Sequence, residues 1–208
     1  MTSSTTIGVV DYAAGNLRSL CNALETVSAG VKLVRTPEDL RECSHVVLPG
    51  VGAFGHCVDG LRRSGMNDPL AEWVMSGNRP LLGICVGMQM LADIGEEHGE
   101  KSGLGWIPGR VSQLPASRSA RVPHVGWNDV RFGPPCGPLA GDFYFDHSFR
   151  FCPADTAHSL GVATHGIEFC AAVRKGSVLG VQFHPEKSQE AGLRFLRWFV
   201  ESRELRNC

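Results

Sequence analysis

A cysteine flanked by glycines is the first feature of the sequence that could do chemistry. The segment Gly83-Ile84-Cys85-Val86-Gly87 follows a short apolar run and precedes a stretch with helical spacing. It matches the thiol version of the G-x-S-x-G nucleophile elbow, in which a sharp strand-to-helix turn exposes the nucleophile above a sheet. A helix that begins after Cys85 would direct free N–H groups at the sulfur and favour the reactive thiolate. We therefore predict that Cys85 is a nucleophile; the alternative is a core cysteine in a glycine-rich turn.

A thiol nucleophile needs a base and a group that orients the base, and the segment around His184 offers both. Pro185 separates His184 from Glu186 and favours an extended conformation for the residue before it. Residues two apart in an extended segment point to the same side, so Glu186 could hold one ring nitrogen while the other faces the thiol. A zinc-deaminase site would need a downstream P-C-x-x-C, and only Cys208 follows.

A glycine-rich loop allows three interpretations. The run GVGAFG at 50–55 is a literal G-x-G-x-x-G, which taken alone suggests a dinucleotide site. That fingerprint normally closes the first strand of its unit and is followed by an acidic residue after the next strand. Here a strand and a helix already precede it, and Asp68 and Glu72 fall in a helical pattern. The loop could instead offer N–H groups to an oxyanion, or form only a tight turn.

Alternating apolar runs predict the elements that position these residues. In the first half, strands are expected at 7–10, 31–34, 45–48 and 80–84. Helical patterns lie between and after them, at 17–30, 37–40, 57–66, 68–76 and 87–94. This alternation is typical of a parallel sheet covered on both faces.

The second half has a different pattern, with short strand-like stretches between glycines and prolines. These stretches lie at 122–125, 143–145, 171–174 and 178–183. An amphipathic helix is expected at 189–205, with Ser188 as its N-cap. We find no internal repeat and predict one α/β domain over 1–208, with its core at about 7–205.

Composition excludes several classes of protein. Hydrophobic residues make up 43% and charged residues 20%, and the formal net charge is −1. These values are typical of a globular domain and give no reason to expect a nucleic-acid or membrane partner. No apolar run approaches the roughly 18 residues of a membrane span, and the N-terminus lacks the basic region of a signal peptide. The eight cysteines include no C-x-x-C pair, so we predict no metal site and a reduced, cytoplasmic protein.

Several motifs in one order resemble a known family. GICVGMQ at 83–89, FHPE at 183–186 and the glycine-rich loop resemble the class I (triad-type) glutamine amidotransferases. DYAAGN at 11–16, PGVGAFG at 49–55, PHVGWN at 123–128 and HPEKS at 184–188 are similar to glutaminase subunits of imidazole glycerol phosphate synthases. The resemblance covers roughly residues 7–205. It implies a flavodoxin-like α/β fold, with a mixed, mostly parallel sheet and helices on both faces, and no cofactor.

The resemblance also implies a role for each matching residue. Cys85 would attack the carboxamide of glutamine, His184 would protonate the departing ammonia, and Glu186 would orient His184. The oxyanion would be held by the N–H groups of Val51 and Val86. The implied contacts to glutamine are Gly52, Gln89, Glu97, Ser148 and Phe149. The implied interface residues are Asn16, Trp127, Tyr144 and Lys187. For Glu97 the alternative is a solvated helix end, and for the interface residues an ordinary surface role.

A partner follows from the same resemblance. It would be a (β/α)₈ synthase subunit in a heterodimer, which uses ammonia from L-glutamine to make imidazole glycerol phosphate and aminoimidazole carboxamide ribotide in histidine biosynthesis. A sister amidotransferase that feeds a different synthase would have the same triad. A cysteine peptidase would leave the GMQ and PGVG segments unexplained, and a nucleotide-binding module would rest on the 50–55 glycines alone. Three positions depart from the family's pattern: Ala13, Asp146 and Phe149.

Overall fold

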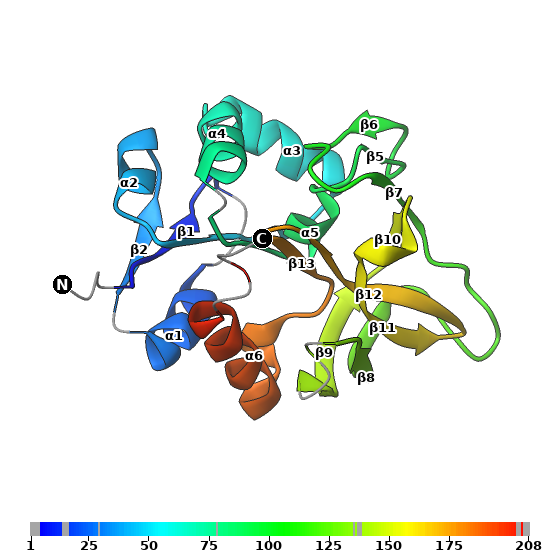
Figure 1. The fold of residues 1–208 in the computed structure, drawn as a ribbon. Coiled ribbons are helices and arrows are strands. Elements are labelled where there is room, and N and C mark those ends of the chain that lie inside the picture. The colour runs from blue at the N-terminus through cyan, green and yellow to red at the C-terminus, as the bar shows by residue number, and fades with distance from the viewer. Residues whose placement is uncertain are drawn as a thin grey trace.

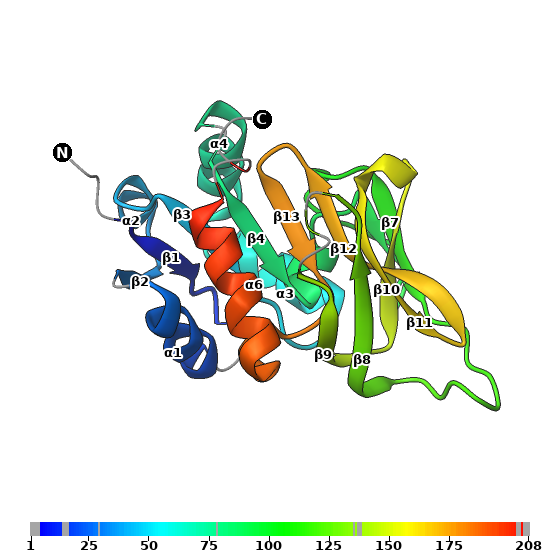
Figure 2. The same ribbon diagram turned by 60° about the horizontal axis from the view of Figure 1, so that its bottom comes forward.

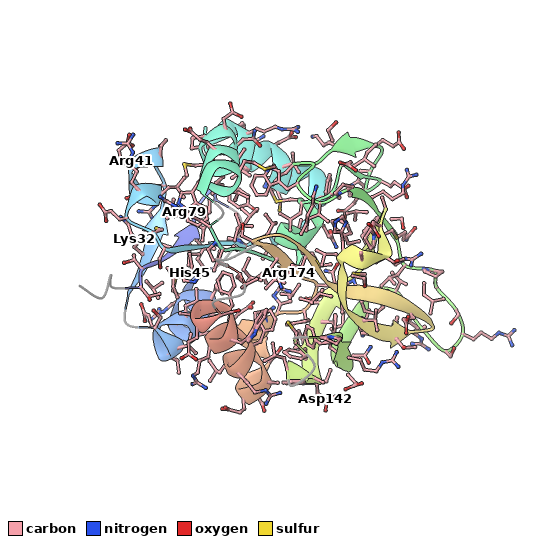
Figure 3. All side chains as sticks on the ribbon, viewed as in Figure 1. Lys32, Arg41, His45, Arg79, Asp142 and Arg174 are labelled. Atoms are coloured by element: carbon pink, nitrogen blue, oxygen red, sulfur yellow. The ribbon has the colours of Figure 1, made fainter. Side chains whose placement is uncertain are left out.

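The computed structural model describes residues 5–13, 17–28, 30–77, 79–134, 136, 139–202 and 205. Figure 1 shows a sheet that runs across the molecule, with helices on both sides of one half and further strands at the other end. The side chains of Arg41 and Asp142 stand at the periphery, as Figure 3 shows. Among the helices in these ranges, none is long and apolar enough to cross a membrane.

Five neighbouring parallel strands form the part of the sheet that carries the nucleophile. They are β1 (Ile7–Val10), β2 (Val31–Val34), β3 (His45–Leu48), β4 (Leu81–Ile84) and β13 (Val178–Val181). Their order is β2-β1-β3-β4-β13. Every residue of β1, β3, β4 and β13 is buried, as a parallel sheet covered on both faces requires. The strands predicted at 7–10, 31–34 and 45–48 are confirmed.

Helices cover both faces of these strands, as predicted. The helices are α1 (Arg18–Val27), α2 (Pro37–Arg41), α3 (Phe54–Arg63), α4 (Asn67–Gly77), α5 (Val86–Gln89) and α6 (Gln189–Glu201). In Figure 1, α1 and α6 lie below the sheet, and α3 and α4 lie above it. The helix expected near 37 begins with a capping box, in which Thr36 and Asp39 satisfy each other's backbone N–H groups.

Antiparallel strands extend the sheet beyond β13, as Figure 2 shows at the right. They are β12 (Ile167–Lys175), β10 (Phe149–Pro153), β7 (Gly109–Gln113), β11 (Ser159–His165), β8 (His124–Phe132) and β9 (Gly141–His147). The short β5 (Ile94–Gly95) pairs with β7 in parallel and with β6 (Lys101–Ser102) antiparallel. The sheet continues as β13-β12-β10-β7, and β11, β8 and β9 follow from β12. The stretches predicted at 143–145 and 171–174 fall within β9 and β12. The structure adds two 3₁₀ turns, η2 (Thr156–His158) and η3 (Pro185–Lys187).

Four helix predictions need correction at their ends. The helix expected at 17–30 ends at Val27, and the one expected at 57–66 spans Phe54–Arg63. The helix expected at 87–94 ends at Gln89, because the next residues form tighter turns and the N–H of Asp93 then bonds to Gly109 in β7. This bond draws 94–95 into the sheet as β5. The last helix ends at Glu201, where Ser202 becomes extended; residues 203 and 204 lie outside the described ranges.

Ser188 stands at the N-cap position of α6 but does not cap the helix with its side chain. Its Oγ donates to the carbonyl of His184 at 2.6 Å and accepts from the N–H of Tyr144 at 3.0 Å. Ser188 is therefore the N-cap residue, as predicted, but the side-chain cap is missing because the hydroxyl is already bonded to Tyr144 and His184.

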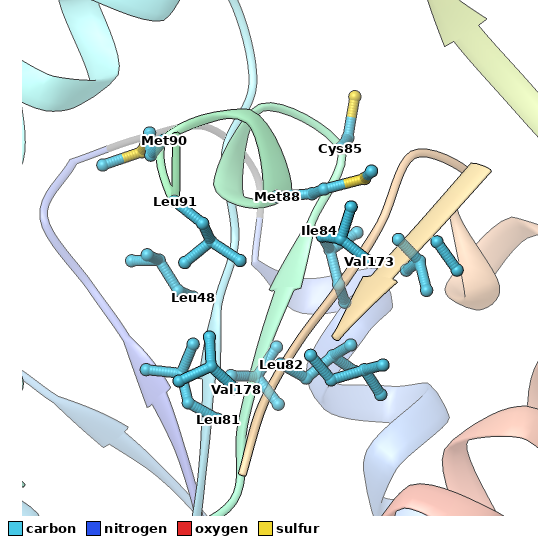
Figure 4. Close-up of a cluster of buried hydrophobic side chains, with 14 of the residues drawn as sticks. Leu48, Leu81, Leu82, Ile84, Cys85, Met88, Met90, Leu91, Val173 and Val178 are labelled. Atoms are coloured by element: carbon cyan, nitrogen blue, oxygen red, sulfur yellow. The ribbon is translucent and has the colours of Figure 1, made fainter. Parts of the chain in front are cut away.

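A buried apolar cluster supports the end of β4. Figure 4 shows Leu48, Ile84, Met88 and Leu91 packed between the strands and α5. Close packing of this kind fixes side chains and backbone to within a narrow range of positions. The turn that follows β4 and carries Cys85 is therefore held in place by the closely packed side chains beneath it.

Candidate active site

Cys85 lies at a strained turn between β4 and α5. Its φ is 55° and its ψ is −113°, a conformation that costs a residue with a side chain of order 1–3 kcal/mol. A Cβ on Gly83 would lie 2.6 Å from the carbonyl oxygen of Gly87, and a Cβ on Gly87 would overlap the carbonyl of Leu48. The turn predicted from the glycine pattern is therefore present. Figure 4 shows the sulfur of Cys85 directed away from the apolar cluster.

His184 and Glu186 form a buried pair beside the thiol. Nδ1 of His184 lies 2.8 Å from Oε1 of Glu186, and the two side chains are only 7% and 10% exposed. The side chain of Cys85 lies close enough to the imidazole to affect its pKa. Burial disfavours the imidazolium, but the hydrogen bonds and charges of Cys85 and Glu186 outweigh it and raise the pKa of His184. The structure thus brings the three predicted triad residues together.

The backbone brings Glu186 to His184 by a tighter turn than expected. His184 is extended, with φ −100° and ψ 96°, and its N–H donates to the carbonyl of Tyr144 at 2.9 Å. Residues Pro185–Lys187 then form η3 rather than the extended segment that the sequence predicts. The carbonyl of His184 closes this turn, because it accepts both the N–H of Lys187 and the hydroxyl of Ser188.

A cavity of about 370 Å³ opens in front of the sulfur. Its walls are Gly50, Val51, Gly52, Cys85, Val86, Gln89, Glu97, Pro123, Asp146, His147, Ser148, Phe149, His184 and Lys187. Both predicted oxyanion residues and all five predicted glutamine contacts are among them, while Glu186 lies outside the wall. Pro123 and Asp146 were not predicted as site residues, although Pro123 belongs to the PHVGWN motif and Asp146 directly precedes the segment His147-Ser148-Phe149.

The glycine-rich loop packs against the turn that carries Cys85. A Cβ on Gly50 would overlap the backbone nitrogen of Gly87, and Gly52 has a φ of 99° that favours glycine. Helix α3 begins just after the loop, and its first N–H, that of Phe54, donates to Oε2 of Glu97 at 2.7 Å. This carboxylate occupies the helix N-terminus that a dinucleotide's pyrophosphate would need. The geometry therefore disfavours the nucleotide interpretation, and Glu97 is not a solvated helix end.

Two buried glutamines connect the nucleophile with the opposite wall. Nε2 of Gln89 donates to the carbonyl of Phe149 and to Oε1 of Gln182, at 3.0 Å in each case. Nε2 of Gln182 lies 3.7 Å from Sγ of Cys85. Phe149 makes this contact through its backbone carbonyl, so the contact does not depend on its side chain. Gln182 was missed in the sequence, although it stands two residues before His184.

A chain of neutral histidines fixes the backbone of Phe149. Nδ1 of His147 lies 2.8 Å from the carbonyl of Phe149, so this nitrogen carries the proton, and Nε2 accepts from Nδ1 of His124 at 2.9 Å. Nε2 of His124 accepts from Asn128 at 3.2 Å. Burial lowers the pKa of His147 to about 3 and that of His124 to about 4. Both rings therefore stay neutral near pH 7, and the direction of the chain is fixed.

Three of the four predicted interface residues contact one another beside the cavity. Trp127 is 49% exposed, and its ring meets that of Tyr144 edge-on, with centroids 6.2 Å apart. Nζ of Lys187, a cavity residue, lies 5.6 Å from the centroid of the Tyr144 ring. The fourth predicted residue, Asn16, lies outside the described residues. Within the described part of the chain, no group of histidine, cysteine or acidic side chains could hold a metal ion.

Comparison with known proteins identifies the family. The model of the family "Glutamine amidotransferase class-I" matches residues 8–202. The chain belongs to this family. This amidotransferase is 47% identical over 208 residues to the "Imidazole glycerol phosphate synthase subunit HisH" of Zymomonas mobilis, covering 96% of the chain and 97% of the relative. It is 43% identical over 205 residues to the "Imidazole glycerol phosphate synthase hisHF, chloroplastic" of Arabidopsis thaliana, covering 96% of the chain and 34% of that longer relative.

A solved glutamine amidotransferase confirms the fold class of this family member. The two structures agree with a TM-score of 0.76 at 22% identity, over 95% of this amidotransferase and all of the other chain. Family membership decides for a glutamine amidotransferase and against the peptidase and nucleotide-module alternatives.

Proposed function

We propose that this amidotransferase is the glutaminase subunit of an imidazole glycerol phosphate synthase. The observation that carries the proposal is the 47% identity to a named subunit of that synthase over nearly the full length of both chains. The enzyme would hydrolyse L-glutamine to glutamate and ammonia and supply the ammonia to the synthase. A sister amidotransferase with another acceptor is the alternative, and it would have the same triad.

We infer that hydrolysis proceeds through a thioester on Cys85. The thiolate, paired with the imidazolium of His184, attacks the carboxamide carbon, and the C–N bond breaks as His184 gives its proton to the departing nitrogen. Neutral His184 then takes a proton from water, which attacks the thioester; the C–S bond breaks, glutamate leaves, and the thiolate–imidazolium pair is restored. The raised pKa of His184 supports a charged imidazole in the first step. Glu186 at Nδ1 would leave Nε2 to face the thiol.

Negative charge on the carboxamide oxygen would be stabilised by backbone N–H groups. We assign this role to Val86, which follows the nucleophile, and to Val51 in the glycine-rich loop, since both line the cavity with Cys85. Such donors act on the transition state, and removal of one typically lowers the rate by about 10²–10³-fold. Glu97, held by the N–H of Phe54, would accept hydrogen bonds from the amino group of glutamine.

We also propose that the synthase partner is a separate (β/α)₈ barrel in a heterodimer. The Zymomonas relative is named as a subunit, and in Arabidopsis the match covers only 34% of a longer protein named for the same synthase. The remainder of that longer chain is long enough to hold a second activity. The cytoplasmic location expected from the sequence stays a prediction.

Reconstitution of the two subunits tests this function. The wild-type complex should form imidazole glycerol phosphate with either glutamine or ammonium as the nitrogen source. Cys85→Ala should abolish the glutamine-dependent reaction and leave the ammonium-dependent reaction intact, because the thiol is needed for hydrolysis but not for the acceptor chemistry.

Glutamate release by Cys85→Ala at a rate comparable to wild type would show that the nucleophile is misassigned. Wild-type glutamate release without product from this acceptor would instead favour a sister synthase.

A further inference from the structure

Two buried side chains from different elements hold the glycine-rich loop from beneath. The hydroxyl of Tyr12, just after β1, donates to the carbonyl of Pro49 at 2.6 Å. The thiol of Cys57, in α3, donates to the carbonyl of Val51, with 3.4 Å between sulfur and oxygen. Tyr12 is 5% exposed and Cys57 is fully buried. Neither side chain is part of the cavity wall.

These two hydrogen bonds fall on either side of a single peptide. The carbonyl of Pro49 belongs to the peptide that joins it to Gly50, and the carbonyl of Val51 belongs to the peptide that joins it to Gly52. Between them lies the Gly50–Val51 peptide, which carries the N–H of Val51. Because the flanking peptides are both held, the central peptide can turn only about the line between the Cα atoms of Gly50 and Val51. Tyr12 and Cys57 thus limit the directions in which this N–H can point.

The surrounding fold leaves room for this support. A Cβ on Gly60, in α3, would lie 3.2 Å from Cδ2 of Tyr12, so the absence of a side chain there makes space for the phenol ring. The Tyr12 hydroxyl also lies 3.5 Å from Sδ of Met90, directly after α5. The phenol therefore connects the loop with the helix that follows the nucleophile. Burial raises the pKa of both Tyr12 and Cys57, so both keep the proton that they donate.

We propose that Tyr12 and Cys57 are positioning residues for the oxyanion site. They hold the peptides on both sides of Gly50–Val51, so that the N–H of Val51 faces the oxygen of the reacting carboxamide. This inference rests on the proposed glutaminase function. A donor that is less well positioned loses stabilisation of the transition state more than binding of the substrate, so kcat should fall while KM stays nearly constant.

The test compares variants in the complex with the synthase partner and its acceptor, with glutamate release as the readout. Tyr12→Phe should lower kcat about tenfold and Cys57→Ala about threefold, with KM within about twofold, since partial misplacement costs less than the roughly 10²–10³-fold of a lost donor. Cys57→Ser keeps a donor at the same place and should restore most of the wild-type kcat.

A second buried cysteine provides the matched control. The thiol of Cys43 donates to the carbonyl of Asp39 at 3.3 Å, next to α2 and outside the cavity wall. Cys43→Ala removes the same kind of hydrogen bond and should leave kcat unchanged.

An unchanged or increased kcat in Tyr12→Phe and Cys57→Ala would overturn the proposal, as would an equal loss in Cys43→Ala. If either Tyr12→Phe or Cys57→Ala does not fold, the kcat of the other variant tests the proposal. Absence of glutamate release by the wild-type complex would count against the proposed function instead.

Discussion

Burial and charge act in opposite directions on His184. Removal from water disfavours its imidazolium, yet Cys85 and Glu186 raise its pKa above the ordinary value of 6.5. A histidine whose pKa is raised in the folded state stabilises the fold fully below pH 6.5, and this contribution is lost as the pH rises through the folded-state pKa. The pair that prepares His184 for proton transfer therefore also makes stability depend on pH above neutrality.

Glu186→Gln should weaken both effects. The neutral amide removes the charge that favours the imidazolium, so the pKa of His184 should fall and its share of the pH-dependent stability should shrink. We expect glutamine hydrolysis to fall by about 10²-fold, within the range of general acid–base catalysis. A pH titration of the His184 ring nitrogens by NMR and kcat against pH would measure these changes.

Glu168→Gln is the matched control, because Glu168 is 60% exposed and pairs with Arg131 at the surface. It should change neither quantity. A His184 titration that does not move in Glu186→Gln would contradict the role given to this carboxylate.

At the scale of elements, the site is assembled by close contacts between the backbones of different segments. The turn after β4 meets the end of β3 at Gly87, and the glycine-rich loop meets the same turn at Gly50. Neither contact leaves room for a Cβ atom. The nucleophile and the proposed oxyanion donors are therefore held together by three elements whose backbones touch.

Gly87→Ala should break this assembly. The new Cβ would overlap the carbonyl of Leu48, and relief of the overlap must move β3 or α5. We expect the free energy of unfolding to fall by about 1–3 kcal/mol or more, together with loss of glutamine hydrolysis. Urea denaturation measures the first effect.

Gly133→Ala serves as the control, since the nearest heavy atom to its Cβ would be the carbonyl oxygen of Leu160, at 3.8 Å. It should cost far less stability. Equal stability of the two variants would show that the turn is not confined as described.

The sequence predicts those helices, strands and turns whose structure depends mainly on their own residues. Four of the five parallel strands are almost wholly apolar because both of their faces are buried, and the G-x-C-x-G pattern located the strained turn. The helix expected at 87–94 failed because a hydrogen bond from Asp93 to Gly109, 16 residues away, draws the chain into the sheet. Ser188 is the predicted N-cap of the last helix but forms no side-chain cap, because the N–H of the distant Tyr144 donates to its hydroxyl oxygen.

In the site, too, contacts between residues far apart in the sequence could not be predicted. Motif spacing pointed to Cys85, His184 and Glu186, which the fold brings together. Gln182 was missed because its partner Gln89 lies 93 residues away, and the support by Tyr12 comes from 37 residues before Pro49. Buried hydrogen bonds between distant segments leave no periodic pattern in a sequence.

At the scale of the whole molecule, three of the four large exposed apolar side chains among the described residues lie in the glycine-rich loop and β8, and the fourth, Met75, lies in α4. Val51, a cavity residue, is 53% exposed, and Val125 and Trp127 in β8 are 55% and 49% exposed. Trp127 is linked through Tyr144 to Lys187 at the cavity wall. Ammonia released at Cys85 would leave through this face, so a partner bound there would shield it from water.

Lys187→Glu should weaken that assembly. The substitution removes a cation from the face of Tyr144, a contact worth about 0.5–1 kcal/mol at an exposed site, and places a negative charge at the proposed interface. We expect the Kd for the synthase subunit to rise about tenfold and less product to form per glutamine consumed. The control is Lys175→Glu, which makes the same charge change. Lys175 pairs with Val178 at the start of β13, whereas Lys187 follows the opposite end of that strand. This control should bind the partner like wild type. Equal affinity of both variants, with unchanged ammonia transfer, would place the partner on another face of the molecule.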